Sequence, residues 1–284
     1  MRVADNRIAT VLGLYKSELA ALYPEEEAKA IARAVFQERM GMDMADLALH
    51  AQDSLSESEL LKVYDPLKRL AAGEPLQYVL GQVHFHGLPV HVGPGVLIPR
   101  PETEELVDHI LRAGYTPSSI VDVGTGSGCI ALALKRSFPE ADVVGVDVST
   151  QALMIAASNA KHNGLAVEWI EVDVLANSFK LPACDLIVSN PPYVPRAESG
   201  TLDPQVRDHE PHVALFVDDA DPQLFFRRIG ELAFATLPAQ GQLWFEGHYR
   251  HASETGELLR RIGFTDVQMI TDLSGNPRFI HATR

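Results

Sequence analysis

The motif Asn190-Pro191-Pro192-Tyr193 follows the apolar run Leu186-Ile187-Val188 after the single residue Ser189 and is the clearest chemical signal in the chain. Proline has a fixed φ and no backbone N–H, so two prolines stiffen this segment and remove two donors. The carbonyls of Asn190 and Pro191 then remain as acceptors, the Asn190 side chain adds a third, and Tyr193 supplies a flat ring. These groups suit a planar NH2 group whose nitrogen faces an electrophile. A proline-rich loop with a packed tyrosine is the structural alternative.

A glycine-rich loop, Gly124-Thr125-Gly126-Ser127-Gly128, joins a predicted strand to a predicted helix. Glycine lets the backbone approach a ligand closely, and open parallel sheets bind ligands at the carboxyl ends of their strands. The dinucleotide-binding spacing requires glycine at position 129, where this chain has Cys129, so the phosphate-binding pattern is not met. A tight turn without a ligand is the alternative.

Two acidic residues end the next two predicted strands. Asp147, one βα unit after the glycine loop, is placed to accept hydrogen bonds from both hydroxyls of a ribose. An alternative role for Asp147 is to cap the helix that begins near Ser149. Asp173 ends the third strand, where an adenine ring would lie, and turn formation is the alternative there. A ribose and an adenine without a phosphate indicate S-adenosylmethionine as the cofactor.

Cysteine and histidine residues give no sign of a metal site or a disulfide. Cys129 and Cys184 lie in apolar runs, so we expect buried free thiols. His84, His86 and His91 are close in sequence, and strand alternation would put His84 and His86 on one face. No cysteine or carboxylate lies between them, so we predict no metal.

The elements that must position these residues begin near residue 119. Short apolar strands are predicted at 120–123, 143–146, 167–170, 186–188 and 242–245, and helices at about 127–137, 149–162 and 222–237. Alternating strands and helices indicate an α/β fold with a doubly wound, mostly parallel sheet. Two more strands, Phe264 to Ile270 and Arg278 to Ala282, are predicted to add an antiparallel edge.

Residues 1–80 show only helical spacing of apolar positions and predict a small helical bundle. Pro24 fits the first position of the second helix. Ser56 and Glu59 fit a capping box, and Pro66 is expected to kink or interrupt the helix that follows.

Residues 81–98 predict a β-hairpin linker whose turn is Gly87-Leu88-Pro89. The remaining residues, 99–284, then form the domain that carries the glycine loop and the Asn190 motif.

Composition limits the possible functions. The 284 residues are 46% apolar with a net charge of −14, which excludes a mainly disordered chain and predicts one large domain with a smaller partner. No apolar run approaches the roughly 18 residues of a membrane span, and the first twenty residues do not resemble a secretory signal, so we expect a cytoplasmic protein. The acidic balance argues against a wide nucleic-acid-binding surface, although it leaves a local basic patch open.

The glycine loop, Asp147 and the Asn190–Tyr193 motif together resemble the Class I S-adenosylmethionine-dependent methyltransferases that modify planar amino groups. Two further stretches, Glu74 to Gly81 and Leu97 to Glu104, resemble signatures of the protein-(glutamine-N5) methyltransferases that act on peptide chain release factors. Glu210 to Leu215 and Asp272 to Arg278 are also similar to that family. The resemblance covers nearly the whole chain and implies a seven-stranded sheet.

The resemblance implies methylation of the side-chain amide nitrogen of the glutamine in the Gly-Gly-Gln motif of class I release factors. By position, the glycine loop, Asp147, Asp173 and Val174 would hold the cofactor, Asn190 would lie near both ligands, and Asn190 to Tyr193 would hold the glutamine. The family often has a bulky aromatic residue where this chain has Val174. The spacing around Glu246 also departs from the expected pattern, so no role is assigned to Glu246.

Three other functions remain open at this point. One is a sister methyltransferase acting on a glutamine of a ribosomal protein. Another is an adenine-N6 methyltransferase of DNA or RNA, although residues 1–80 contain no Lys/Arg cluster that would hold a strand. The third is a catalytically silent S-adenosylmethionine-binding adaptor, which would need a degraded catalytic motif. We expect a monomer whose helical domain docks the protein substrate, with no direct contact to nucleic acid and none to a membrane.

Overall fold

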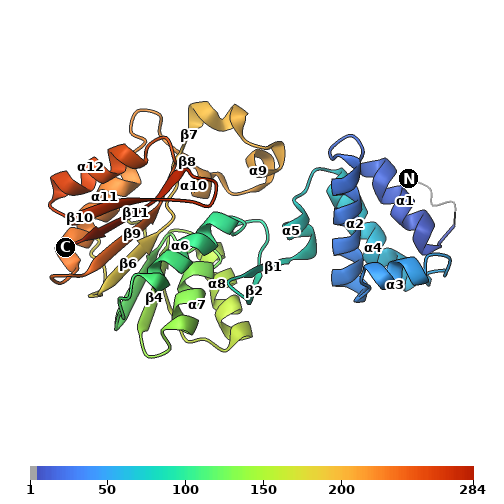
Figure 1. Ribbon diagram of the computed structural model, residues 1–284, viewed down its shortest axis with the longest axis horizontal. Coiled ribbons are helices and arrows are strands. Elements are labelled where there is room, and N and C mark those ends of the chain that lie inside the picture. The colour runs from blue at the N-terminus through green and yellow to red at the C-terminus, as the bar shows by residue number, and fades with distance from the viewer. Residues whose placement is uncertain (1–4) are drawn as a thin grey trace. The chain divides into compact units, whose positions relative to one another are not determined.

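The computed structural model describes residues 5–284 and divides them into two compact units (Figure 1). One unit comprises the described residues up to Gly81 together with Pro204–His209, and the other comprises Gln82–Asp203 and Glu210–Arg284. Each unit has its own hydrophobic core. Within residues 5–284, no helix combines the length and the apolar character that a membrane span requires.

The first unit is a helical bundle, as the sequence predicts. Its helices are α1 (Ile8–Leu19), α2 (Glu25–Met40), α3 (Met44–Leu49), α4 (Glu57–Ala71), α5 (Leu76–Leu80) and α9 (Pro204–His209). Tyr15, Phe36, Leu67 and Leu70 are fully buried at its centre. Ser56 begins α4 with the expected capping box, in which its side chain and that of Glu59 each bind the other residue's backbone N–H.

Of the kink or interruption predicted at Pro66, the interruption is not found, and the predicted position of Pro24 is wrong. Helix α4 runs unbroken from Glu57 to Ala71 with Pro66 buried inside it. The apolar face that includes Val63 and Leu67 packs into the core, and this burial offsets the hydrogen bond that proline removes. Pro24 is the N-cap of α2 rather than its first helical residue.

The short helix α9 groups with the helical bundle although it is about 130 residues further along the chain than Gly73. The side-chain amide of Gln205 donates a hydrogen bond to the hydroxyl of Tyr23. His209 lies against Gly73, where an added Cβ would come within 3.6 Å of the imidazole Nε2. No feature of the sequence indicates this association.

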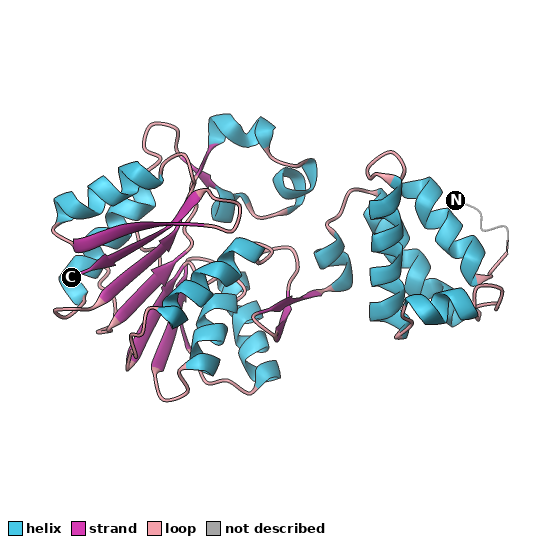
Figure 2. Ribbon diagram, in the orientation of Figure 1, coloured by secondary structure: helices cyan, strands magenta, loops and turns pink. Residues whose placement is uncertain are grey.

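The second unit contains a seven-stranded sheet in the order β10-β11-β9-β6-β3-β4-β5 (Figure 2). Its strands are β3 (Ser119–Val123), β4 (Asp142–Asp147), β5 (Glu168–Glu171), β6 (Leu186–Ser189), β9 (Gln242–Glu246), β10 (Thr265–Thr271) and β11 (Pro277–Thr283). The first five of these run parallel, while β11 pairs antiparallel with both β9 and β10. The predicted doubly wound, mostly parallel sheet with an antiparallel edge is confirmed.

Helices cover both faces of this sheet. They are α6 (Pro101–Arg112), α7 (Cys129–Ser137), α8 (Thr150–Asn163), α11 (Leu224–Thr236) and α12 (Ala252–Ile262). Side-chain alternation along β3 separates the two faces. Val121 and Val123 pack in one cluster with Phe226 of α11 and Leu259 of α12. Asp122, between them, accepts a hydrogen bond from the start of α7.

The order of the strands reverses between β3 and β6. From β3 the chain moves outward through β4 and β5, then returns to place β6 on the other side of β3. Open α/β sheets bind ligands in the crevice at such a point, outside the carboxyl ends of the strands. The glycine loop follows β3 and the Asn190 motif follows β6, so the topology brings both to this crevice.

A hairpin of β1 (Gln82–Phe85) and β2 (Leu88–His91) precedes the sheet. The prediction of its turn is wrong, since Leu88 and Pro89 belong to β2 and the turn is His86-Gly87. Both turn residues have positive φ, 48° and 72°, as a two-residue hairpin turn with the favoured twist requires. His86 therefore lies in the turn rather than beside His84 on a strand face.

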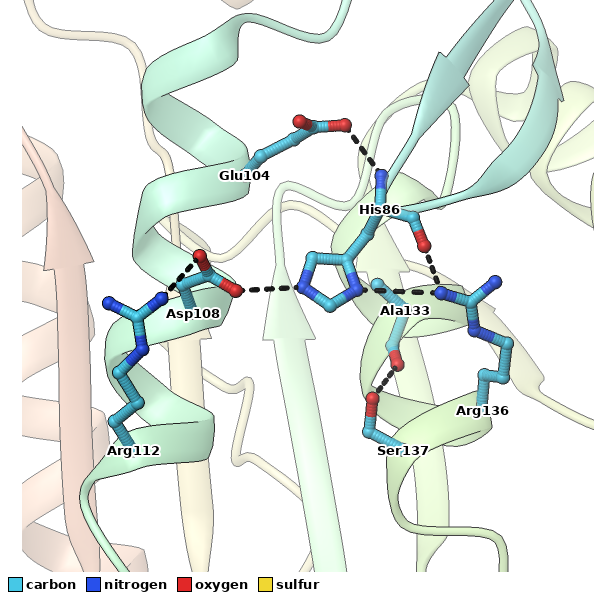
Figure 3. A network of polar contacts seen from close by, with 7 residues as sticks. All are labelled: His86, Glu104, Asp108, Arg112, Ala133, Arg136 and Ser137. Atoms are coloured by element: carbon cyan, nitrogen blue, oxygen red, sulfur yellow. Dashed lines mark hydrogen bonds and ion pairs between the residues drawn. The ribbon is translucent and has the colours of Figure 1, made fainter.

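His86 also attaches this hairpin to two helices (Figure 3). Its backbone N–H donates to Glu104 and its imidazole lies 3.1 Å from a carboxylate oxygen of Asp108, both on α6. Arg136 of α7 donates to its carbonyl oxygen. The hairpin thereby fixes the start of the segment that runs through Gly95 to α6.

The two thiols are as predicted, because Cys129 and Cys184 are both buried and free.

Four short elements that periodicity does not predict surround the Asn190 motif. They are β7 (Val194–Pro195), the 3-10 helix η1 (Arg196–Thr201), α10 (His212–Leu215) and β8 (Phe216–Val217), with β7 and β8 paired in parallel.

Candidate active site

A cavity of about 310 Å3 lies at the switch point of the sheet. Its lining brings together most of the residues that the sequence singles out. These are Gly124, Thr125, Gly126, Ser127, Asp147, Asp173, Val174, Asn190, Pro191 and Pro192. Gly128 and Tyr193 are not among the lining residues.

The glycine loop owes its shape to three left-handed residues. Gly124, Gly126 and Gly128 have φ values of 74°, 56° and 80°, a region that side chains disfavour. A Cβ on Gly124 or Gly126 would meet no atom within 4 Å, whereas one on Gly128 would come within 2.9 Å of Trp169. The first two glycines thus leave open space on the cavity side, and the third allows close packing at the start of α7.

Asp147 joins the glycine loop to the end of β4. One carboxylate oxygen accepts a hydrogen bond from the Gly126 N–H at 2.9 Å, and the other accepts from the Ser149 N–H at 2.9 Å. Burial raises the pKa of Asp147, while these backbone donors oppose that rise. The cap of α8 is Ser149, whose hydroxyl accepts from Ala152. Asp147 therefore lines the cavity with a carboxylate held in place and is not the N-cap residue of α8.

The segment after β5 forms one wall of the cavity. An Asp173 carboxylate oxygen accepts from the Leu175 N–H at 2.9 Å, and its carbonyl accepts from the Ala176 N–H at 3.0 Å, so Asp173 does form a turn. Both Asp173 and Val174 still line the cavity. Val174 also packs against the large core cluster, so the wall is aliphatic at the position where a bulky aromatic residue is common in the family.

The Asn190 motif closes the other side of the cavity. Asn190, Pro191 and Pro192 line it, and Asn190 follows the fully buried end of β6. The ring of Tyr193 instead packs against the large core cluster and edge-on against His248, with ring centroids 6.0 Å apart. Burial raises the pKa of Tyr193, so the phenol stays protonated at neutral pH.

Glu246 and Thr103 reach the same site, and sequence reasoning missed both. Glu246 is the last residue of β9 and is 1% exposed. The Thr103 hydroxyl donates to its carboxylate at 2.8 Å, and burial raises the pKa of Glu246 to about 7. The position of Glu246 at the end of a strand is the one sequence feature that could have pointed to this role. Because β9 lies next to β6, the last residue of β9 lies beside Asn190.

Two segments that resemble family signatures meet through a buried ion pair. Glu210, 3% exposed, accepts from the Arg100 guanidinium at 2.5 Å and from the Ile98 N–H at 3.0 Å. This contact fixes the Leu97–Glu104 stretch, whose residues Leu97, Pro99 and Thr103 line the cavity. A charged group buried this deeply requires such partners.

The residues of the cavity fit S-adenosylmethionine. Asp147 offers carboxylate oxygens for ribose hydroxyls, and Val174 offers an apolar wall for a planar base.

The hydroxyl oxygen of Ser127 and one carboxylate oxygen of Asp122 are buried, and neither has a hydrogen-bond partner within residues 5–284. Burial raises the pKa of Asp122 to about 7. No group of three or more His, Cys, Asp or Glu in this part of the chain could hold a metal ion.

Comparisons with known proteins show which family this chain is similar to. Residues 101–203 match the family described as Methyltransferase small domain, and residues 10–81 match the PrmC N-terminal domain. A release factor glutamine methyltransferase from Flavobacterium psychrophilum is 40% identical over 92% of this chain and 94% of its own length. This chain belongs to the release factor glutamine methyltransferase family. S-adenosylmethionine is accordingly its cofactor, and the chain is a protein-glutamine methyltransferase.

Other members of the family and a solved structure extend the comparison. The release factor glutamine methyltransferase of Bacteroides thetaiotaomicron is 37% identical over 98% of this chain and all of its own length. A 16S rRNA N2 G1207 methyltransferase from T. thermophilus, solved with AdoMet and guanosine, superposes with a TM-score of 0.52. It is 19% identical over 72% of this chain and 49% of its own, so this likeness shows the methyltransferase fold alone.

Proposed function

We propose that this protein transfers a methyl group from S-adenosylmethionine to the side-chain amide nitrogen (N5) of the glutamine in the Gly-Gly-Gln motif of class I peptide chain release factors. The observation that carries the proposal is that Asn190, Pro191 and Pro192 line the same cavity as the glycine loop and Asp147. A site for a planar amide thus adjoins a site for a nucleoside. The name shared by relatives 37–40% identical to this chain supports the substrate.

The cofactor half of the site is assigned to residues at or after the ends of β3, β4 and β5. Gly124, Thr125, Gly126 and Ser127 would let the backbone approach the cofactor, and Gly128 would let the loop pack closely against Trp169. Bound S-adenosylmethionine supplies a methyl group on a positively charged sulfur, which is open to attack by a nucleophile.

Three further residues would complete the cofactor half of the site. Asp147 would accept hydrogen bonds from the ribose hydroxyls, and Asp173 and Val174 would flank the base. The position of all three on the wall of the same cavity supports this assignment.

The substrate half of the site is assigned to the Asn190 motif. The side-chain carbonyl of Asn190 and the backbone carbonyl of Pro191 would accept the two hydrogens of the glutamine amide. Pro192 would keep this corner rigid, since its φ is fixed and it has no N–H. Tyr193 packs against the core behind this corner and would hold it in place.

The chemistry asks little of the protein beyond alignment. An amide nitrogen is a poor nucleophile because its lone pair is delocalised, and holding it in line with the methyl carbon is worth up to roughly 7–11 kcal/mol. The carbonyl acceptors also stabilise positive charge that develops on the attacked nitrogen, the reverse of an oxyanion hole. The proton can then leave to water, so no covalent intermediate with the protein is needed.

We also propose a role for each part of the chain. Residues 1–80 would dock the release factor, and residues 99–284 would transfer the methyl group. Residues 81–98 would link these two domains. The formal charge of −14 supports a protein substrate rather than a nucleic acid. We propose that the protein acts as a monomer in the cytoplasm.

The test is a methyl-transfer assay with labelled S-adenosylmethionine and a purified class I release factor. Label on the release factor, and none on a variant whose motif glutamine is replaced, is the expected result. Parallel reactions with ribosomal proteins and with an adenine-containing oligonucleotide examine the two rival substrates. Label on either of those and not on the release factor would overturn the proposal.

A further inference from the structure

Three polar side chains from distant parts of the chain meet beside the cavity. Thr103 is on α6, Asn190 follows β6, and Glu246 ends β9. Strands β6 and β9 are parallel neighbours with Ser189 opposite Phe245, so the next residues, Asn190 and Glu246, lie side by side. Thr103 is 3% exposed and Glu246 is 1% exposed. These contacts are therefore made away from bulk water, where hydrogen bonds are strong and unpaired groups are costly.

The hydrogen bonds run from Asn190 to Thr103 and from Thr103 to Glu246, each residue donating to the next. The Thr103 hydroxyl has a single proton and gives it to the Glu246 carboxylate at 2.8 Å. Toward Asn190 the same oxygen can only accept, and it lies 3.4 Å from the Asn190 side-chain nitrogen. The Glu246 carboxylate, on the residue beside Asn190 in the neighbouring strand, is a second acceptor because it has no proton to give when ionised.

The orientation of the Asn190 amide follows from this pattern. The two ends of an asparagine amide are similar in shape and differ in that one donates and the other accepts. Two acceptors on one side hold the NH2 end there and turn the oxygen end away from them. A flipped amide would place three acceptor oxygens together, with their lone pairs opposed.

We propose that Thr103 and Glu246 are positioning residues that fix the Asn190 amide with its oxygen toward the NH2 group of the substrate glutamine. This inference rests on the proposed function for the identity of the substrate. The orientation itself is a property of the protein and can be tested without the substrate.

The charge on Glu246 adds a dependence on pH. Burial raises its pKa to about 7, Arg278 of β11 lowers it, and Glu102 of α6 raises it. The charge of this carboxylate also contributes to the raised pKa values of Tyr193 and Cys129, although burial is the larger cause for both. A protonated Glu246 can donate to either oxygen neighbour, so the preference for one orientation of the Asn190 amide weakens as the pH falls below about 7.

The kinetic test compares Thr103→Val, which keeps the shape, with Thr103→Ser, which keeps the hydroxyl. For Thr103→Val, kcat is expected to fall about tenfold, the worth of one buried hydrogen bond. The KM for the release factor should stay within about twofold, because one amide is a small part of a protein interface. Thr103→Ser should recover most of kcat. Equal losses in the two variants, or no loss in either, would overturn the proposal.

The pH profile supplies a second variant, Glu246→Gln. In the wild type, kcat should rise as the pH increases through about 7, and in Glu246→Gln this rise should disappear. The variant isolates Glu246 from Asp122, whose pKa is also raised to about 7 by burial. An unchanged profile in Glu246→Gln would contradict the role of the carboxylate.

A readout without turnover separates this inference from the proposed function. The side-chain NH2 signals of Asn190 in a 15N NMR spectrum, assigned with Asn190→Ala, should shift with pH in the wild type and stay fixed in Glu246→Gln. If the wild type does not methylate the release factor, the proposed substrate is wrong while this shift still decides the orientation. If the wild type methylates the release factor and the Asn190 signals respond to pH in the same way in the wild type and in Glu246→Gln, the inference alone fails.

Discussion

The backbone N–H of Gly126 donates a hydrogen bond of 2.9 Å to the carboxylate of Asp147. This bond joins the turn after β3 to the end of β4, the two places where the chain would hold a nucleoside. The same carboxylate accepts from the Ser149 N–H through its other oxygen. Asp147 therefore fixes the shape of the glycine loop, and in the proposed site it would also accept hydrogen bonds from a ribose, so its loss should affect both the loop and cofactor binding.

Replacing Asp147 with Ala should weaken cofactor binding by about ten- to hundredfold. Hydrogen bonds to a charged acceptor are worth roughly 1.5–3 kcal/mol, and the loop would also lose its anchor. Isothermal titration with S-adenosylmethionine measures the change. Asp142→Asn, at the exposed start of the same strand, is the matched control and should bind normally. Similar losses in the two variants would contradict the assignment.

Asn190→Ala should abolish methyl transfer while leaving most of the cofactor affinity. In the proposed site the side-chain carbonyl holds the amide that is attacked, so its removal should lower kcat by at least about a hundredfold. The proposed cofactor contacts come from the glycine loop and Asp147, so we expect the Kd for the cofactor to change by less than about fivefold. Parallel losses of turnover and affinity would place Asn190 in the cofactor site alone.

The glycines of the loop should respond differently to alanine. At Gly128 the φ is 80° and a Cβ would lie 2.9 Å from Trp169 and 3.1 Å from Ala156, so Gly128→Ala should cost about 2–4 kcal/mol of stability. At Gly124 the φ is 74° and an added Cβ would meet no atom within 4 Å, so Gly124→Ala should lower the stability by only about 1–2 kcal/mol. Urea denaturation gives both values, and equal costs would mean that strain alone acts at Gly128.

Local patterns predict the fold of this protein well and some of its turns poorly. The β-strands and helices after residue 119 follow from apolar periodicity, because each βα unit must bury one face of its helix. Pro66 does not interrupt α4 because the effect of a proline depends on tertiary packing, which keeps this helix whole around a buried proline. The hairpin turn was misplaced because His86 adopts a positive φ, which is uncommon among non-glycine residues.

The site was only partly predictable for a related reason. Asn190 and the glycine loop can be predicted from the sequence because each lies in a short contiguous motif. Thr103 and Glu246 are 143 residues apart and become partners only when α6 packs beside β9. Glu246 gives no local signal of burial, since a glutamate at a strand end is ordinarily solvated.

The ion pair between Arg100 and Glu210 should be asymmetric in its contribution to stability. The Glu210 side chain is 1% exposed and the Arg100 side chain 31% exposed. Removing the cation leaves a buried carboxylate with one backbone donor, so Arg100→Met should cost about 3 kcal/mol. Glu210→Gln should cost less, because the amide oxygen can still accept from Ile98 and Arg100 can reach water.

The exposed pair between Arg112 and Asp108 provides a control for that measurement. These side chains are 74% and 45% exposed, and such pairs are worth about 0–1 kcal/mol. Arg112→Met should therefore leave the free energy of unfolding within that range of the wild type. If Arg100→Met cost no more than this, the Leu97–Glu104 stretch would be held by something other than Glu210.

The pH dependence of stability should reveal the cost of keeping Glu246 buried. Its pKa is raised from 4.5 to about 7 in the folded protein. A carboxyl group with a raised folded pKa favours folding below its unfolded pKa, and this contribution is lost as the pH rises through the folded value. Between pH 4.5 and about 7.5 the wild type should thus lose up to about 3 kcal/mol through this group.

Glu246→Gln removes that titration, so the difference in unfolding free energy between the variant and the wild type should grow with pH and level off above about 7.5. Using the difference cancels Asp122, which titrates in the same range in both proteins. Urea denaturation at several pH values supplies the numbers. A difference that stays constant from pH 5 to 8 would show that Glu246 is charged throughout, and the rise of kcat through pH 7 would then need another group. A growing difference, together with lower turnover, would show that this chain gives up stability to hold a carboxylate beside Asn190.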